Sequence, residues 1–134
     1  MHAQGSFEVK MNAQPPLSER DGVVIGRATF DKHFSGGLEA TSVVWFTSVR
    51  TPDPAAAAYV AIERIDGTLD GRAGSFVVTH LATSDADRRS LEVVIVGGSG
   101  TGALVGITGR MTIQVEVDAT RTSSTTPSAR ADPR

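Results

Sequence analysis

Glu63 and His80 are the residues of this chain whose types and spacing point most directly to chemistry. They lie in residues 59–80, where apolar and polar side chains alternate on both sides of a turn that we predict at residues 70–73, so the segment predicts a β-hairpin. With that turn, Glu63 lies opposite His80 on the apolar face, which should point inward. A buried carboxylate beside an imidazole can transfer protons in general acid–base catalysis. We therefore expect a catalytic pair here, against the alternative that the two side chains only satisfy each other's hydrogen bonds.

Tyr59 is predicted to share this face with the pair. Its hydroxyl can donate a hydrogen bond to a substrate carbonyl. The predicted catalytic set is therefore Glu63, His80 and Tyr59.

A second hairpin is predicted around two adjacent glycines, Gly36 and Gly37. If they form a two-residue turn, Phe34 pairs with Glu39, and one face of the hairpin is again apolar, with Lys32 and Glu39 near its end. Aromatic side chains at a period of two are also what a packed core requires. From the two hairpins together, the side chains expected to contact a substrate are Phe30, Phe34, Glu39, Trp45, Phe76 and Val78.

Several other chemistries are disfavoured. The chain has no cysteine, and His2, His33 and His80 are not spaced to bind one metal ion, so we expect no metal site. Residues 98–103 formally match the dinucleotide-binding pattern G-x-G-x-x-A, but no helix is predicted to follow them, and a tight β connection explains the glycines better. No G-x-S-x-G motif for serine hydrolysis is present. We expect no cofactor.

Composition limits the classes of partner. The 134 residues carry a formal net charge of −2, which does not favour nucleic-acid binding. No signal peptide and no apolar run of membrane-spanning length are evident, so we expect a cytoplasmic protein without membrane contact. A single domain is predicted over residues 1–119. Residues 120–134 contain no large apolar side chain and are predicted to form a disordered tail.

Short Val-, Ile-, Thr- and Phe-rich segments follow one another along the chain, separated by turn residues, which predicts an antiparallel all-β fold. We expect strands at residues 5–11, 23–34, 38–49, 58–69, 74–82, 91–96, 104–107 and 111–119. Eight strands closed into a barrel would leave no exposed edges. Because aromatic residues make up only 5% of the chain, such a barrel should keep room for one small ligand.

Five motifs give the chain a family resemblance: residues 5–9 (GSFEV), 34–39 (FSGGLE), 59–64 (YVAIER), 67–76 (GTLDGRAGSF) and 98–106 (GSGTGALVG). Together they resemble the DUF3224 family of small bacterial proteins of unknown function. The resemblance implies an eight-stranded barrel similar to allene oxide cyclase and, more distantly, to dirigent proteins. Such relatives bind apolar small molecules inside the barrel, steer cyclisation or coupling by shape, and form dimers or trimers.

Two features depart from the family pattern. Residues 11–14 (MNAQ) replace a common tryptophan, and residues 111–119 run directly into the polar tail. Both changes remove bulky side chains, so the mouth or lumen should differ from that of a typical member.

The resemblance and the predicted pair favour a cofactor-independent cyclase or isomerase. It would fold a hydrophobic, polyketide- or lipid-like molecule inside the barrel, with acid–base assistance, because orientation alone can lower a barrier by several kcal/mol. The alternative is a non-catalytic carrier for an apolar small molecule. A third possibility is a structural homo-oligomer with a filled barrel.

Overall fold

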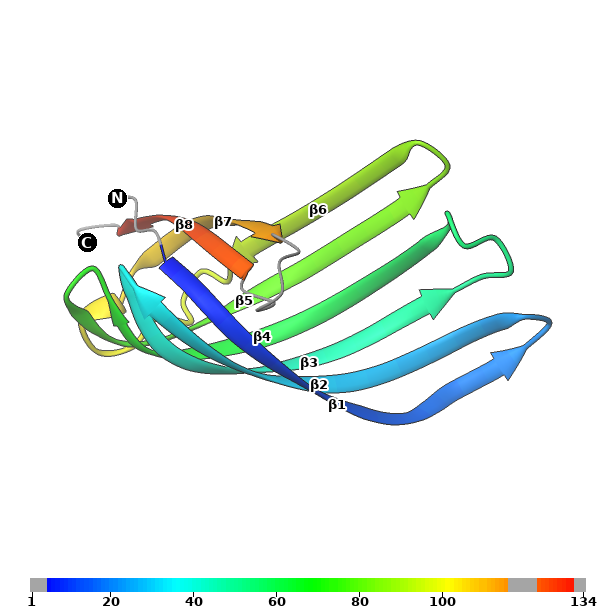
Figure 1. Ribbon diagram of the computed structural model, residues 1–134. Helices are drawn as coiled ribbons and strands as arrows, with labels where there is room; N and C mark the ends of the chain where they lie inside the picture. The colour runs from blue at the N-terminus through cyan, green and yellow to red at the C-terminus, as the bar shows by residue number, and fades with distance from the viewer. Residues whose placement is uncertain (1–4, 116–122, 132–134) are drawn as a thin grey trace.

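The computed structural model describes residues 5–115 and 123–131, and side chains as far as Met111. This part of the chain is almost entirely β-structure, with one short 3-10 turn, η1 (Gly102–Leu104). The strands are β1 (Gly5–Arg20), β2 (Val23–Gly36), β3 (Leu38–Arg50), β4 (Ala57–Leu69), β5 (Arg72–Asp85), β6 (Arg88–Ile95), β7 (Ile107–Val115) and β8 (Ser123–Ala131) (Figure 1). The expected antiparallel all-β fold is confirmed.

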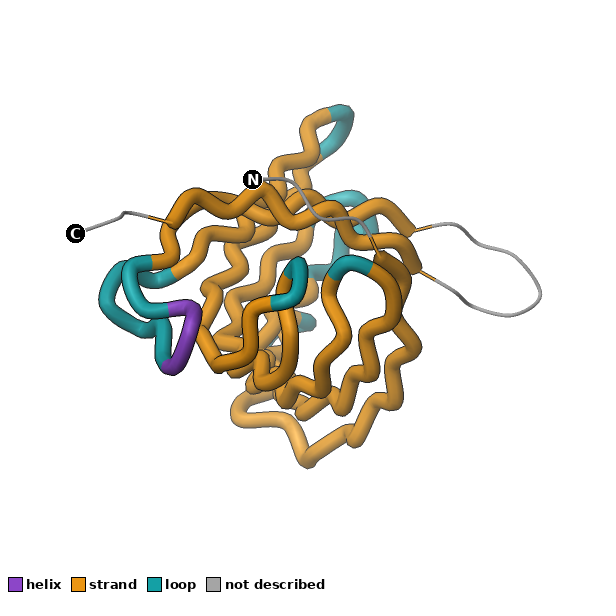
Figure 2. Tube along the Cα trace, turned by 90° about the vertical axis from the view of Figure 1, so that its left-hand side faces the viewer, coloured by secondary structure: helices purple, strands orange, loops and turns teal. Residues whose placement is uncertain are grey.

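All strands belong to one sheet in which each strand pairs with its neighbour in sequence. The order returns to its start through three residue pairs, which join residues 5–7 of β1 to residues 123–125 of β8. β6 likewise pairs with β7 only over residues 93–95. Strands β1 to β6 therefore extend well beyond β7 and β8 at one end, where the sheet is curved but open (Figures 1 and 2).

We name the two ends by this difference. The closed end carries the β2–β3 and β4–β5 turns and is covered by β7 and β8, whereas the open end carries the β1–β2, β3–β4 and β5–β6 connections (Figure 1).

The N-terminal strand is longer than predicted because two prolines bend it without ending it. The β1–β2 register shifts between Gln14 and Ser18, and Pro15 and Pro16 lie within this irregular stretch. Proline has no N–H group for the ladder, so it is tolerated only at such bulges and at strand edges. The Nε atom of Arg27 donates a hydrogen bond to the carbonyl oxygen of Pro15, 3.1 Å away.

The C-terminal part differs most from the sequence prediction. The strand predicted at residues 104–107 is wrong, because Leu104 ends η1 and Gly106 adopts a positive φ of 85° that turns the chain before β7. Residues 111–115 lie in β7, and residues 116–119 lie outside the described residues. Where the sequence predicts a disordered tail, the structure places Ser123–Ala131 in β8, paired with β7. Backbone pairing of this kind needs no apolar side chain.

The β4–β5 hairpin has a register that differs from the prediction by two residues. Its turn is Asp70-Gly71, and both residues have positive φ, 49° and 79°, which is typical of a tight type I′ turn. Glu63 consequently pairs with Val78, and His80 lies two residues further along β5, opposite Ala61. The prediction of direct opposition is wrong, but a shift of two keeps every side chain on its face.

The β2–β3 hairpin differs by one residue, and this reverses a face. Phe34 pairs with Ala40 because the chain needs one more residue to turn, with Gly36 at a φ of 106°. Trp45, 52% exposed, and Glu39 therefore lie on the outer face and not inside. Their predicted roles in substrate contact are corrected by this register.

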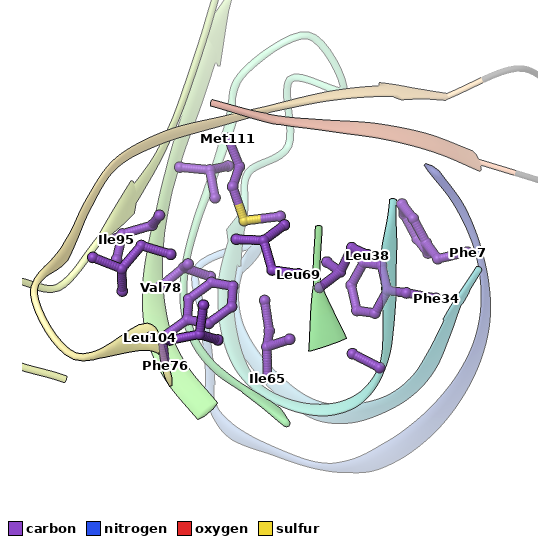
Figure 3. Close-up of a cluster of buried hydrophobic side chains, with 13 residues drawn as sticks. Phe7, Phe34, Leu38, Ile65, Leu69, Phe76, Val78, Ile95, Leu104 and Met111 are labelled. Atoms are coloured by element: carbon purple, nitrogen blue, oxygen red, sulfur yellow. The ribbon is translucent and has the colours of Figure 1, made fainter. Parts of the chain in front are cut away.

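The apolar core fills the closed end. Aliphatic and aromatic side chains from opposite sides of the curved sheet point toward one another there (Figure 3). Phe7 and Phe34 contact each other with ring centroids 5.3 Å apart. Leu104 of η1 contributes to the same cluster. The closed end is thus occupied by side chains, and free space is left to the open end.

Candidate functional site

Glu63 is the centre of a buried polar cluster on the inner face of the sheet. His80 Nε2 lies 2.8 Å from its Oε1 atom, and Lys32 Nζ donates to the same oxygen at 3.3 Å. Ser42 Oγ donates to Oε2 at 2.6 Å. Glu63 is 1% exposed and His80 5% exposed, so the cluster is almost completely removed from water. The predicted proximity of Glu63 and His80 on a buried face is confirmed.

Sequence reasoning missed Lys32 and Ser42 as members of this cluster. The two residues pair directly across β2 and β3, and Ser42 is diagonal to Glu63 on β4. Finding them would have required the correct β2–β3 register, because only the observed register brings Ser42 to the inner face. The ammonium group of Lys32 also lies 4.5 Å from the ring centroid of Phe7, a cation–π contact.

The cluster holds Glu63 in its ionised form. Burial raises the pKa of the Glu63 carboxyl, but the hydrogen bond from His80, the charge of Lys32 and the hydrogen bond from Ser42 outweigh burial, so the pKa lies below its ordinary value of 4.5. A carboxylate that accepts three donors is a poor proton donor near neutral pH. It is a fixed negative charge.

A cavity of about 780 Å³ opens on the inner face at the open end. Most of its lining is small or apolar. Alongside the alanines and Gly26 it includes two aromatic side chains in contact, Phe46 and Tyr59, whose rings are tilted by 37° with centroids 4.8 Å apart. We call this space the open-end cavity. Its wall also includes Met11, Pro16, Val24, Val49 and Leu91.

Tyr59 is the predicted catalytic residue that lines this cavity. The pKa of its hydroxyl is raised above 10.0, first by burial and second by the negative charge of Glu63. Glu63 and His80 are not among the lining residues, and both lie closer to the closed end along their strands. Tyr59 is therefore a cavity residue whose pKa depends on the charge of Glu63 in the buried cluster.

The residues predicted to contact a substrate lie elsewhere. Phe34, Phe76 and Val78 are buried in the closed-end core. Phe30 packs edge-on against Phe46, with centroids 5.3 Å apart, but does not itself line the cavity. Glu39 and Trp45 lie on the outer face. None of the six residues predicted to contact a substrate lines the cavity.

The glycine-rich loop is a connection that covers the end of β5. Ser99 Oγ accepts a hydrogen bond from the N–H of Val77 at 3.0 Å, and Thr101 Oγ1 accepts one from the N–H of Ser75 at 3.0 Å. A Cβ atom on Gly100 would lie 1.9 Å from the carbonyl oxygen of Leu104, so only glycine fits. Close packing against β5 explains these glycines.

Neither a metal centre nor a membrane-spanning helix is found in the described part of the chain. Within residues 5–115 and 123–131, no group of three or more His, Asp or Glu side chains is arranged to hold a metal ion. The same residues form no helix that is long and apolar enough to cross a bilayer. The expected homo-oligomer and the cytoplasmic location stay predictions.

The fold and the cavity define a small all-β protein whose sheet has an apolar hollow on its inner face. The sequence matches the family described as protein of unknown function (DUF3224) over residues 3–124, and the chain belongs to this family. A crystal structure of a DUF3224 protein of unknown function from Shewanella oneidensis MR-1 is similar, with 35% identity and a TM-score of 0.90. The similarity covers 99% of this chain and 98% of the other. No curated protein matches the chain.

Proposed function

We propose that this protein binds an apolar small molecule in the open-end cavity. The observation that carries the proposal is the cavity itself, about 780 Å³ of space with a largely apolar lining on the inner face of an otherwise well-packed sheet. Ligand sites are typically concave, mostly apolar and of this size. Phe46 and Tyr59 give the space an aromatic wall against which a ring or an unsaturated chain can pack.

The test uses an uncharged apolar dye, Nile red, and a variant that fills the cavity. Ala82 pairs with both Tyr59 and Leu91 and lines the cavity, so Ala82→Phe should weaken dye binding at least tenfold by placing a ring in the space. Thr79→Phe, on the exposed outer face of the same strand, is the matched control and should bind as the wild type does. Equal binding by all three proteins, or no binding by the wild type, would show that the cavity is not a ligand site.

A second candidate, a cofactor-independent cyclase or isomerase, is favoured by Tyr59. Tyr59 lines the cavity, and ionisation of its hydroxyl is opposed by burial and by Glu63, so the hydroxyl remains a neutral donor for a substrate carbonyl or epoxide oxygen. The cavity would fold a hydrophobic, polyketide- or lipid-like substrate, and Glu63 with His80 would act through Tyr59 by holding a negative charge behind it. Glu63 and His80 are positioning residues in this version.

Metabolite profiling of the host strain tests the second candidate. Deletion of the gene should remove a cyclised or isomerised product, and Tyr59→Phe should reduce it. Trp45→Phe, an aromatic substitution on the outer face, should leave the profile unchanged. An unaltered profile in the deletion strain would leave binding as the function, and a normal product level with Tyr59→Phe would remove Tyr59 from the reaction.

We further propose that the sheet is an eight-stranded barrel of the allene oxide cyclase type. The pairing of residues 5–7 with residues 123–125 supports this, because a hydrogen-bonded first and last strand leaves fewer exposed edges at the closed end. Hydrogen exchange on the full chain should then show slow amides in both segments. Fast exchange in residues 123–125, with slow exchange in β2 to β5, would mean an open sheet.

A further inference from the structure

The open-end cavity has an uneven charge. Three arginines, Arg27, Arg50 and Arg89, are among its lining residues, and no aspartate or glutamate is. In a chain whose formal net charge is −2, this concentration of positive charge around one apolar space is unexpected. It points to the charge of the molecule that the cavity takes.

Two of these arginines lie in one row at the mouth. Arg50 pairs with Ala57, Ala57 with Ser84, and Ser84 with Arg89, so the row crosses four neighbouring strands from β3 to β6. Arg50 shares the inner face with Ser42, and Arg89 shares it with Val93, because they are separated by even numbers of residues. Both arginines therefore line the cavity at its open end, one from β3 and one from β6.

Neither mouth arginine is neutralised by a residue that the structure describes. Among the described residues, no carboxylate lies within salt-bridge distance of Arg50 or Arg89. Asp85 and Asp87, in the β5–β6 hairpin, line a neighbouring hollow together with Arg89 but make no ion pair with it. Arg27 is different, because its Nε atom is engaged by Pro15.

The inner end of the cavity has the opposite character. It is formed by Ala28, Phe46 and Tyr59, and the ionised Glu63 lies behind Tyr59. A negative group of a ligand would lose its hydration against these apolar side chains without gaining a cation, because Lys32 is already paired with Glu63. At the mouth it would be attracted by planar guanidinium groups, which suit carboxylate, sulfonate or phosphate oxygens. An apolar group would have the reverse preference.

We infer that the open-end cavity takes an amphipathic organic anion, held with its acidic group between Arg50 and Arg89 and its apolar body against Phe46 and Tyr59. This inference rests on the proposed binding function and adds the chemical class and the orientation of the ligand. It also gives the mouth arginines a role that the packing of the sheet does not require.

The experiment compares two probes of equal chain length, dodecanoate and dodecanol, by isothermal titration calorimetry on the full chain. Wild-type protein should bind dodecanoate about tenfold more tightly than dodecanol, since contacts to a charged group contribute on the order of 1.4 kcal/mol or more. The double variant Arg50→Gln/Arg89→Gln should remove this preference and leave dodecanol binding unchanged. Arg64→Gln/Arg72→Gln, which removes the same charge from exposed positions on β4 and β5, should behave as the wild type does.

The outcomes separate the two proposals. Equal affinity of the wild type for both probes would overturn the anion inference and leave apolar binding intact. A preference for dodecanoate that falls equally in both double variants would also overturn it, because general electrostatics would then be the cause. Binding of neither probe would overturn the inference and the proposed function together.

Discussion

The Nε2 atom of His80 lies 2.8 Å from Oε1 of Glu63, although the two residues are diagonal and not opposite in the β4–β5 hairpin. Diagonal neighbours on one face of a sheet are within reach when the side chains are long. Because Lys32 Nζ contacts the same oxygen and Ser42 Oγ donates to the other, one carboxylate on β4 binds side chains from the three strands β2, β3 and β5. Loss of that carboxylate should therefore be felt in all three.

Removal of the Glu63 charge should destabilise the fold. We expect Glu63→Gln to lower the free energy of unfolding by about 3 kcal/mol, because it leaves the Lys32 ammonium, 10% exposed, without its counter-charge. Urea unfolding followed by circular dichroism measures the effect. The double variant Lys32→Met/Glu63→Gln should recover a large part of the loss. A change below about 1 kcal/mol for Glu63→Gln would show that the ion pair contributes little.

The contribution of Glu63 should depend on pH in a defined direction. The pKa of Glu63 is lowered in the folded state from its ordinary value of 4.5. At any pH above 4.5 the ionised carboxylate therefore stabilises the fold. As the pH falls below 4.5, the unfolded state takes up a proton first, and the stabilisation is lost progressively until the folded-state pKa is passed. The stability difference between wild type and Glu63→Gln should therefore shrink on acidification from neutral pH. A difference that grew on acidification would contradict the lowered pKa.

Tyr59 provides a direct measurement of the field of Glu63. The chain has one tyrosine, so the ultraviolet absorbance of tyrosinate titrates this residue alone. Its pKa should lie above 10.0 in the wild type, and Glu63→Gln should lower it without restoring the ordinary value, because burial is the larger cause. Asp66→Asn, which removes an exposed acid on the outer face of the same strand, is the control. Identical titrations of wild type and Glu63→Gln would disprove the coupling.

The Asp70-Gly71 turn should require its glycine. Gly71 has a φ of 79°, and no atom lies within 4 Å of the place that a Cβ atom would take, so Gly71→Ala introduces backbone strain and no collision. We expect a loss of about 1 kcal/mol in the free energy of unfolding. Gly97→Ala is the matched control, because Gly97 also has free space but no positive φ, and its effect should be near zero. Equal effects of the two substitutions would mean that the turn tolerates alanine.

The two hairpins show what could be predicted from the sequence and what could not. Alternation of apolar and polar residues located β2 to β6, and it put Glu63 and His80 on one buried face although their register was displaced by two. A register displaced by an odd number has a different consequence, because side chains along a strand alternate between the two faces. One additional residue in the β2–β3 turn placed Trp45 on the outside, where the prediction had it inside. Turn length is decided by positive φ at one or two residues, and the alternation pattern carries no information about it.

Prediction of the buried cluster and of the cavity mouth would have required the correct registers of several strand pairs at once. The contact of Lys32 with Glu63 joins β2 to β4 and needs two registers to be correct at once. The row from Arg50 to Arg89 needs three. β8 was missed for another reason, since its residues lack the apolar pattern that predicts a strand and pair through the backbone.

The placement of the chain's single tryptophan and single tyrosine has a practical consequence for spectroscopy. Trp45 is on the convex outside and Tyr59 on the concave inside of the same pair of strands. Tryptophan emission will therefore report on whatever touches the exterior, such as another molecule in a crowded solution, while the tyrosine signal follows occupancy of the interior. Tryptophan emission excited beyond the tyrosine band and tyrosinate absorbance therefore report on different faces of the sheet without any engineered label.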